Sequence, residues 1–352
     1  MSYNDGWAAI NLQMPSRVPR TEYSIERHWE LIRYVTGVEA SESSPAGVQA
    51  AASAALYKAW NFDFLWSIRT HNEIFGDTRT KMGHASYLEG GVDYDNDVSS
   101  PFANYEAVLA FDPSAVFTTP SVSDLCRDYS AHYAQNRAFY PDAVNMTGIY
   151  VSCVSGLLEL FGWTLLLEAL GYDPQGFGDC VKRYGRFIRP YFEGLANCDA
   201  PLIMVHDDLT WTSGPFASPA WYREYVFPTL KDCISPLLES GKKVAFTSDG
   251  DFTAFIDDIA ALGVHGFVME PTTDMAYIAE KYGKTHFFIG NADTRALAFG
   301  NKADIIAEVR RCMDIGKKCP GFFMAVGNHI PANTPVENVL WYNECYEKMA
   351  KR

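Results

Sequence analysis

The feature that most constrains the fold is a cycle that repeats from about residue 145 to residue 340. In each cycle a short apolar run ends in polar residues, and a turn then leads into a helical pattern closed by glycine or lysine. Nearly continuous apolar runs are typical of parallel strands that are buried on both faces. Two weaker strand candidates precede the cycle, at 17–24 and 61–69. Within the cycle we predict strands over residues 148–156, 201–209, 242–250, 266–271, 285–293 and 321–330.

The segments between these strands carry helix start and stop signals. Asp251 can cap a helix that has its apolar residues on one face and that Gly263 closes. Ser218 followed by Pro219 is a typical helix start, and a further amphipathic helix is predicted over 301–315. Strands that alternate with crossover helices form either a closed (β/α)8 barrel or a doubly wound sheet. No GxGxxG motif follows a strand, so the dinucleotide-binding sheet is disfavoured and we predict an α/β protein with a TIM barrel.

The cycle is lost between Met82 and Val144. The stretch MGHASYLEGGVDYDNDVSSPF is rich in Gly, Asp, Asn and Ser, which is typical of a long loop. We predict that it forms an insertion over the barrel mouth and that the residues before the first strand form an N-terminal extension. Because no change in composition marks a second domain, residues 1–352 are predicted to form a single domain.

Charge and cysteine usage exclude several classes of protein. The formal net charge is −14 and no basic stripe is present, which argues against a nucleic-acid partner. The eight cysteines lie singly, without a CxxC or HxC pair, so neither a disulfide framework nor a thiolate zinc finger is predicted. No secretory signal is visible, and the longest apolar stretch contains Glu159 and Glu168. We therefore expect a cytoplasmic protein without a membrane span.

Polar side chains follow five consecutive predicted strands. In a TIM barrel the carboxyl ends of the strands converge on one face, and this face holds the active site. One polar strand end is explained by a turn, whereas five predict a polar pocket above an apolar barrel. The residues concerned are His206, Asp207, Asp208, Ser248, Asp249, Glu270, Asn291, Asp293, Asn328 and His329.

Four stretches, taken together, resemble the uroporphyrinogen decarboxylase superfamily, which includes cobalamin-dependent methyltransferases. The stretches are HDDLTWTSGPFASPAWYREYVFPTLK, KKVAFTSDGD, IGNADTRALAFG and AVGNHIPANTPVENV. The resemblance covers most of the chain and is clearest from 201 to 340. It implies a TIM barrel with the active site at the carboxyl ends of the strands.

The resemblance also separates branches of the superfamily. The decarboxylases carry an arginine-rich N-terminal motif for a substrate with many carboxylates, and this sequence has only Arg17 and Arg20 there. Methyltransferases that use coenzyme M hold zinc through an HxC pair and a distant cysteine. Here those positions fall on Thr247, Asp249 and a residue near Asn328, so the thiolate ligands are absent. The branch that remains resembles O-demethylases, which transfer a methyl group from an aryl methyl ether to the cobalt of a corrinoid protein.

This branch implies a candidate catalytic set. Breaking an ether bond requires a proton or a Lewis acid at the departing oxygen. We predict that Asp249, Glu270 and His329 are catalytic and bind Zn²⁺, with His206 as the reserve ligand. Without a metal, His329 would be the general acid and Asp249 would orient it. The residues predicted to contact the cofactor are His206, Asp208, Ser248 and Asn291, and the choice between Asp207 and Asp208 stays open.

The resemblance implies a corrinoid protein as a partner in trans, because the chain is too short to hold its own corrinoid domain. A small methylated aromatic donor suits the aromatic content of 14%. A homodimer is one expectation for the assembly. Two alternatives stay open, namely decarboxylation of a tetrapyrrole by a uroporphyrinogen decarboxylase-type reaction and a non-catalytic barrel that binds a corrinoid.

Overall fold

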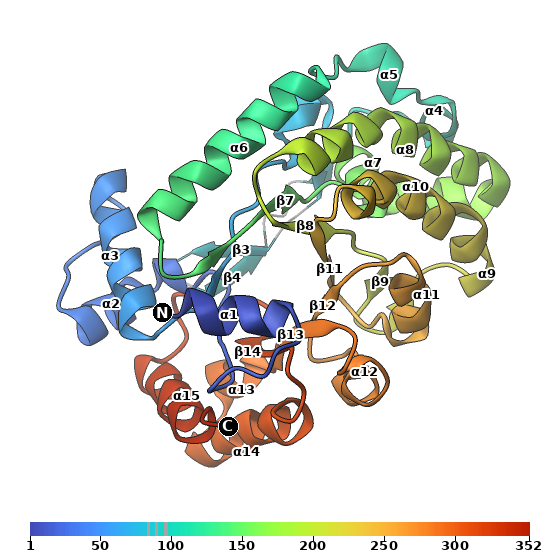
Figure 1. Ribbon diagram of the computed structural model, residues 1–352. Coiled ribbons are helices and arrows are strands. Elements are labelled where there is room, and N and C mark those ends of the chain that lie inside the picture. The colour runs from blue at the N-terminus through green and yellow to red at the C-terminus, as the bar shows by residue number, and fades with distance from the viewer. Residues whose placement is uncertain (83–84, 89–90, 95–97) are drawn as a thin grey trace.

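A computed structural model describes the backbone of residues 1–82, 85–88, 91–94 and 98–352, and the side chains of residues 1–80 and 99–352. Its centre is a parallel six-stranded sheet in the order β14-β13-β12-β11-β8-β7 (Figure 1). All six strands of the predicted cycle are present, and each is shorter than predicted. The strands are β1 (Phe64–Leu65), β6 (Val144–Asn145), β7 (Thr147–Ile149), β8 (Leu202–His206), β11 (Lys243–Ser248), β12 (Gly266–Met269), β13 (Phe287–Ala292) and β14 (Phe322–Val326).

Two segments early in the chain close this sheet into a barrel. Residues 19–23 lie beside β14, with Arg20 in a parallel bridge to Met324. On its other side Arg20 O accepts a hydrogen bond from Asp63 N (3.0 Å), just before β1. Strand β1 pairs in parallel with β6, which continues into β7. The weaker strand candidates at 17–24 and 61–69 therefore supply the two missing strands, and the (β/α)8 barrel is confirmed.

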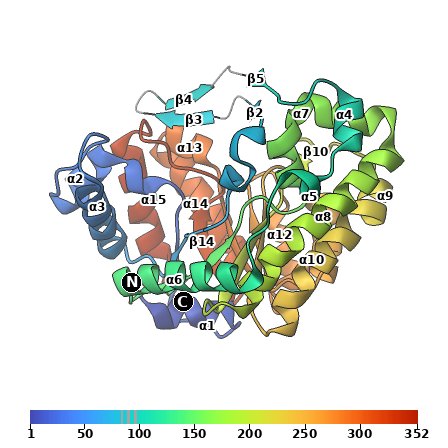
Figure 2. The same ribbon diagram turned by 90° about the horizontal axis from the view of Figure 1, so that it is seen from above.

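The N-terminal extension forms the floor of the barrel. Helix α1 (Tyr3–Ile10) lies across one end of the strands (Figures 1 and 2). Ile10 belongs to the same buried cluster as Phe64 and the other inward-facing strand residues. Gly6 allows this close approach, because a Cβ atom there would lie 2.5 Å from Asp63 O. The apolar barrel interior is thus closed at the end opposite the predicted active site.

Helices cover the outside of the barrel (Figure 1). Among the described residues, one helix, α7, is long and apolar enough to cross a membrane by length and composition alone, but 67% of its apolar window is buried inside the protein. It packs as a core helix. The main covering helices are α6 (Val122–Phe139), α7 (Val154–Tyr172), α8 (Pro174–Asn197), α10 (Phe227–Glu239), α11 (Ile256–Ala261), α12 (Met275–Tyr282), α13 (Thr294–Phe299), α14 (Lys302–Gly316) and α15 (Val336–Met349).

The predicted insertion over the mouth contains more regular structure than a loop. Its short strands β2 to β5 lie at the end of the barrel opposite α1 (Figure 2). The helices α4, α5 and α6 follow along the chain. Their first turns are capped by Asn104, Asp112 and Ser121 respectively, each of which accepts a hydrogen bond from a backbone N–H of its helix. Residues 83–84, 89–90 and 95–97 of the predicted loop lie outside the described residues. The elements before and within the insertion are α2 (Trp29–Thr36), α3 (Ala46–Ala59), β2 (Lys81–Met82), β3 (Ala85–Leu88), β4 (Gly91–Tyr94), β5 (Val98–Ser99), α4 (Tyr105–Ala110) and α5 (Pro113–Val116).

Short elements complete the chain between the barrel strands and the covering helices. They shape the loops that follow the strands, and Ser218 caps α9 as the Ser-Pro signal predicts. These elements are η1 (Ile25–Arg27), η2 (Asn72–Thr78), β9 (Thr210–Trp211), β10 (Gly214–Pro215), α9 (Pro219–Trp221), η3 (Tyr222–Val226) and η4 (Thr253–Phe255).

Candidate active site at the barrel mouth

A cavity of about 420 Å³ opens where the barrel strands end. Its wall combines the polar strand ends that the sequence singles out with aromatic residues from the first third of the chain. Asp249, Glu270 and His329 all line it. The described lining residues are Glu22, Tyr23, Ser24, Glu26, Tyr57, Leu65, Trp66, Ile68, Asn136, Tyr140, Tyr150, Met204, His206, Thr247, Ser248, Asp249, Val268, Met269, Glu270, Gly327, Asn328 and His329.

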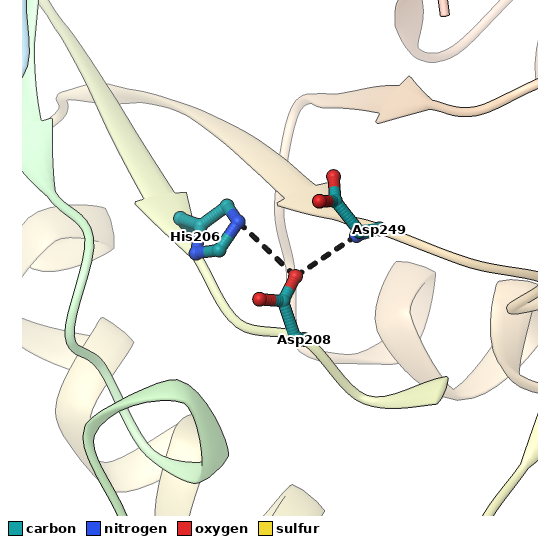
Figure 3. A group of neighbouring side chains, drawn as sticks. All are labelled: His206, Asp208 and Asp249. Atoms are coloured by element: carbon teal, nitrogen blue, oxygen red, sulfur yellow. Dashed lines mark hydrogen bonds and ion pairs between the residues drawn. The ribbon is translucent and has the colours of Figure 1, made fainter. Parts of the chain in front are cut away.

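His206 and Asp249 line this cavity, and Asp208 contacts both of them. His206 Nε2 lies 3.1 Å from Asp208 Oδ1, and the same carboxylate oxygen accepts a hydrogen bond from Asp249 N (3.0 Å), as Figure 3 shows. One potential ligand atom from each of the three side chains lies within 4.8 Å of the other two. Strand β8 ends at His206 and β11 ends just before Asp249, and their parallel pairing brings the two strand ends together.

Burial and mutual charge set the protonation of this group. Burial opposes a charge on His206, but the adjacent Asp208 carboxylate outweighs it and raises the pKa of the imidazole to about 9. Burial alone would raise the pKa of Asp208, and the His206 imidazolium instead lowers it. Loss of hydration among the surrounding protein atoms, together with the negative charge of Asp208, raises the pKa of the Asp249 carboxyl to about 8, although this side chain is exposed. One cation, one carboxylate and one protonated carboxyl therefore coexist at neutral pH in the metal-free protein.

The two neighbouring aspartates have different roles. Asp207 is fully buried, and its Oδ1 accepts a hydrogen bond from Ser155 N (2.8 Å) in the first turn of α7. Burial raises the pKa of Asp207 to about 7. Asp208 turns to the other side and joins His206 and Asp249. The question left open by the sequence is therefore answered by the strand geometry, since successive side chains at a strand end point in opposite directions.

Glu270 is tied to the loops that follow two other strands. Its Oε2 accepts a hydrogen bond from Gly250 N (2.7 Å), and its Oε1 accepts one from Asn328 Nδ2. Gly250 adopts φ of 78°, and a Cβ atom there would lie 2.6 Å from Trp211 O, so the position requires glycine. Glu270 thus holds the loop that carries Asp249 in place while it lines the same cavity.

His329 lies on the other side of the mouth. Its Nδ1 is hydrogen-bonded with Ser24 Oγ, and its backbone forms a parallel bridge with Tyr23. Burial lowers the pKa of the His329 imidazole, so the ring is neutral at pH 7. The predicted trio shares one cavity, but the three-residue group with metal-ligand spacing consists of Asp249 with His206 and Asp208, without Glu270 and His329.

Two residues predicted to contact the cofactor serve the surrounding framework. Ser248 Oγ accepts a hydrogen bond from Leu209 N (3.1 Å) and thereby links the ends of β8 and β11. Asn291 donates from Nδ2 to Glu270 O (3.1 Å), and its Oδ1 accepts from Arg311 (2.9 Å). Asn291 is not among the described residues that line the cavity.

The sequence reasoning did not single out the aromatic side chains of the wall as individual site residues. Tyr23 stacks on Trp66, with ring centroids 4.8 Å apart, and Tyr150 stacks on His206 at 3.7 Å. Trp66 and Tyr57 belong to the aromatic-rich sequence YKAWNFDFLWS, which was the available signal. Tyr23 reaches the cavity only because its segment closes the barrel, and no local pattern reveals that closure.

The arginines and cysteines that could define other branches of the superfamily do not reach the cavity. Arg20 is fully buried, with Nη2 3.0 Å from Glu22 Oε1, and Arg17 pairs with Asp63 at 2.6 Å. The described cavity lining contains no Lys, no Arg and no Cys. The part of the wall that the structure describes therefore has neither a cationic cluster for a polyanion nor a thiolate for a soft metal site.

The group around His206 fits a divalent metal ion. His206 is 1% exposed, and its Nε2 contacts Asp208 without making a well-directed hydrogen bond, so this buried nitrogen has capacity for a further partner. One imidazole nitrogen and two carboxylates suit Zn²⁺ and comparable borderline ions, with coordination positions left for water or substrate.

Comparisons with known proteins agree with this architecture. Residues 133–349 match the family model "Uroporphyrinogen decarboxylase (URO-D)". Curated uroporphyrinogen decarboxylases are similar to the chain, one from Pelobacter propionicus at 26% identity over 51% of both chains and one from Syntrophotalea carbinolica at 27% over 53% of both. The matches span about half the length of these relatives. A solved structure titled "methyltransferase from Methanosarcina mazei" shares the fold, with a TM-score of 0.64, 17% identity and coverage of 97% of this chain and 96% of that one.

Proposed function

Because the chain belongs to the uroporphyrinogen decarboxylase family, we propose that it is a methyltransferase that works at the mouth of its barrel. In this proposal the methyl donor is a small methylated compound, and an aryl methyl ether is the first candidate. The acceptor is the cobalt of a corrinoid protein that binds in trans. The reaction is then an O-demethylation.

The cavity around His206, Asp208 and Asp249 carries this proposal. Its volume of about 420 Å³ lies near the lower end of the range of roughly 300–1,000 Å³ that is usual for small-ligand sites. That size suits a single substituted ring. The stacked pairs of Tyr23 with Trp66 and of Tyr150 with His206 offer flat faces for such a ring.

In the reaction the carbon–oxygen bond of the ether breaks, and the methyl group passes to the acceptor cobalt, which supplies the electron pair. The ring oxygen keeps the bonding pair and needs a positive charge or a proton. A zinc ion held by His206, Asp208 and Asp249 would supply Lewis-acid stabilisation of that oxygen. We propose that Glu270 positions Asp249 through Gly250 N, and that His329 lies on the opposite side of the donor as a second polar contact.

In the metal-free protein the same residues suit proton transfer. The raised pKa of Asp249, about 8, leaves a proton on its carboxyl at neutral pH. The departing oxygen could take up that proton, and Asp208 keeps the neighbouring His206 charged. Ser248 and Asn291 are proposed to keep the strand ends in register rather than to touch the donor.

The alternative, decarboxylation of a tetrapyrrole that carries many carboxylates, has less support. Arg17 and Arg20 are paired with Asp63 and Glu22, and the cationic side chain among the described lining residues, His206, is itself paired with Asp208. A substrate with several carboxylates would face Glu26 and Glu270, and the described wall has no Lys or Arg to pair with its carboxylates. The non-catalytic alternative predicts that substitutions at Asp249 leave every assayed activity unchanged.

The test is a methyl-transfer assay with purified protein, reduced cobalamin as the acceptor and a panel of methoxylated aromatic donors. We expect methylated cobalamin and a free phenol in equal amounts, with a loss of at least about a hundredfold in Asp249→Ala. Asp251→Asn is the matched control, because Asp251 lies in the same loop and its side chain accepts only from Thr253 N (2.9 Å) in the described structure. No methylated cobalamin from any donor, together with release of CO₂ from uroporphyrinogen, would favour the decarboxylase.

A further inference from the structure

The charged groups in the cavity wall are distributed unevenly. Among the described lining residues, four carry carboxyl groups (Glu22, Glu26, Asp249 and Glu270) and none is Lys or Arg. Glu22 is paired with Arg20 (3.0 Å) and Asp249 belongs to the group with His206 and Asp208, so Glu26 and Glu270 are the acids left without a cationic partner within the described structure. The positive charge of His206 is matched by Asp208 at 3.1 Å. Away from the His206 group, an anionic substituent on a bound ring would therefore meet acidic side chains and, among the described lining residues, no Lys or Arg.

Two of the acids belong to different segments of the cavity wall. Asp249 follows β11, beside His206 and Asp208. Glu26 lies in η1, where its Oε2 accepts a hydrogen bond from Tyr57 on α3 (3.3 Å) and where Tyr140 also lines the wall. Figure 1 shows α3 and β11 on different sides of the barrel. A ring with its ether oxygen near Asp249 would direct its far substituents towards Glu26 and Tyr57.

The wall also contains neutral hydrogen-bond donors without partners. Tyr23 Oη, Trp66 Nε1 and Thr247 Oγ1 are buried, and none has a hydrogen-bond partner within the described structure. All three residues line the cavity. Unpaired buried donors are costly unless a ligand satisfies them. The hydroxyl and methoxy oxygens of a phenolic ring are acceptors of the required kind.

We propose that the cavity selects an uncharged methoxylated phenol and disfavours the same ring when it carries a carboxylate. This inference rests on the proposed function, since it names the substrate class for that site. Tyr23 and Trp66 donate to the oxygen substituents of the ring. Glu26 repels an anionic substituent at the far end.

Binding of two matched ligands, measured by titration calorimetry at pH 7.5 and low salt, tests the proposal. The ligands are 2-methoxyphenol and 4-hydroxy-3-methoxybenzoate, which differ only by the carboxylate. We expect the neutral ring to bind at least about tenfold more tightly to the zinc-loaded protein. Equal affinities, tighter binding of the carboxylated ring or no binding of either ring would overturn the proposal.

Three variants locate the effect. Glu26→Gln removes the charge at nearly constant shape. It should reduce the ratio between the dissociation constants of the two ligands to less than about threefold. Glu239 is an exposed residue at the end of α10, so Glu239→Gln makes the same change of charge away from the cavity. It should leave the ratio between the two dissociation constants unchanged. Tyr23→Phe keeps the stacked ring, removes one donor and should weaken binding of the neutral ring about threefold to tenfold. If the ratio between the two dissociation constants stayed unchanged in Glu26→Gln, Glu26 would not be the repelling group and the proposal would be overturned.

Methyl-transfer rates separate this inference from the proposed function. Selective binding of the neutral ring without any methyl transfer would leave the selectivity standing and refute the methyltransferase. A larger kcat/KM for the carboxylated donor than for the neutral one would support the methyltransferase and refute the selectivity.

Discussion

At the scale of single residues, chemistry at the barrel mouth depends on which way each side chain leaves its strand. Asp207 and Asp208 are adjacent, yet one caps a core helix and the other joins His206 and Asp249. The carboxyl of Asp249 carries no strong hydrogen bond of its own in the described structure, whereas its backbone N–H is fixed by Asp208. A side chain in this position is available for a ligand.

The metal-binding capacity of this group can be measured directly. Asp249→Asn keeps the shape of the side chain and removes a charged ligand. We expect its zinc affinity, measured by competition with a chromogenic chelator, to fall by at least about tenfold. Asp251→Asn should keep the affinity of the parent protein. Equal zinc affinity in both variants would contradict the assignment of Asp249 as a ligand.

Gly250 provides a second test at this scale. A side chain there would meet the backbone of the β9 segment at a left-handed conformation, so Gly250→Ala should lower the free energy of unfolding by about 1–3 kcal/mol. Gly47→Ala is the control, because a Cβ atom at this exposed position of α3 meets nothing within 4 Å. It should raise the stability by up to about 1 kcal/mol. Urea denaturation of both variants measures the difference.

At the scale of elements, closure of the barrel depends on a buried charge in an aromatic box. The guanidinium of Arg20 lies 4.4 Å from the ring centroid of Tyr346 and 5.2 Å from that of Trp60. It also pairs with Glu22, which in turn accepts a hydrogen bond from Tyr342 Oη (2.7 Å). Residues 19–23, the first barrel strand, therefore contact α15 as well as β14.

Removing one partner of this pair should be far more costly than removing both. Arg20→Met leaves Glu22 buried without its counter-charge, and we expect a loss of about 3–5 kcal/mol in the free energy of unfolding. The double variant with Glu22→Gln should recover part of this loss. Arg295→Met, which breaks an exposed pair with Asp293, should cost less than about 1 kcal/mol. Additive losses in the double-mutant cycle would contradict the coupling.

How far the sequence predicts the elements depends on how local their signals are. The six strands of the cycle, the cap at Ser218 and the helix predicted over 301–315 follow from apolar runs and from short-range signals, and the structure contains them. The predicted strands extend too far because the sequence pattern does not mark where the backbone turns away. Residues 154–156 of the first predicted strand already belong to α7, and Gly250 at the end of the third adopts a φ of 78°. The helices α4 to α6 were missed because the prediction joined the Gly- and Asp-rich stretch at 82–102 to the residues that follow it, where Asn104, Asp112 and Ser121 cap the three helices.

At the scale of the whole molecule, the sequence predicts that polar strand ends meet at one mouth, but not which of them touch. The contact of His206 with Asp208 needs the three-dimensional direction of each side chain. The placing of Tyr23 beside Trp66 needs the closed barrel. Both depend on pairings between segments far apart in the chain, which a single sequence does not encode in any local pattern.

The stability of the folded molecule should also depend on pH through its buried histidines. Burial, Lys243 and His286 lower the pKa of His265 to about 4, and its Nδ1 accepts a hydrogen bond from Val244 N (3.2 Å). Between pH 6.5 and 4 the unfolded chain binds the proton more readily than the native protein, so the contribution of His265 to stability is complete above pH 6.5 and is lost as the pH falls.

A difference measurement isolates this effect. After allowance for solvent screening we expect His265 to contribute on the order of 1 kcal/mol to the loss of stability between pH 6.5 and 4. In His265→Asn, the free energy of unfolding should fall less between pH 6.5 and 4, by on the order of 1 kcal/mol. Urea unfolding of the two proteins at four pH values measures it, and parallel curves would show that His265 is not the titrating group.

The pairing of residues 19–23 with β14 has a consequence for biosynthesis. Arg20 and Met324 meet across about 300 positions of the chain, and such distant contacts form late in folding. During translation the edge of the first strand stays unpaired until Met324 and the rest of β14 have left the ribosome. A shielding chaperone would be most useful to this protein in that interval.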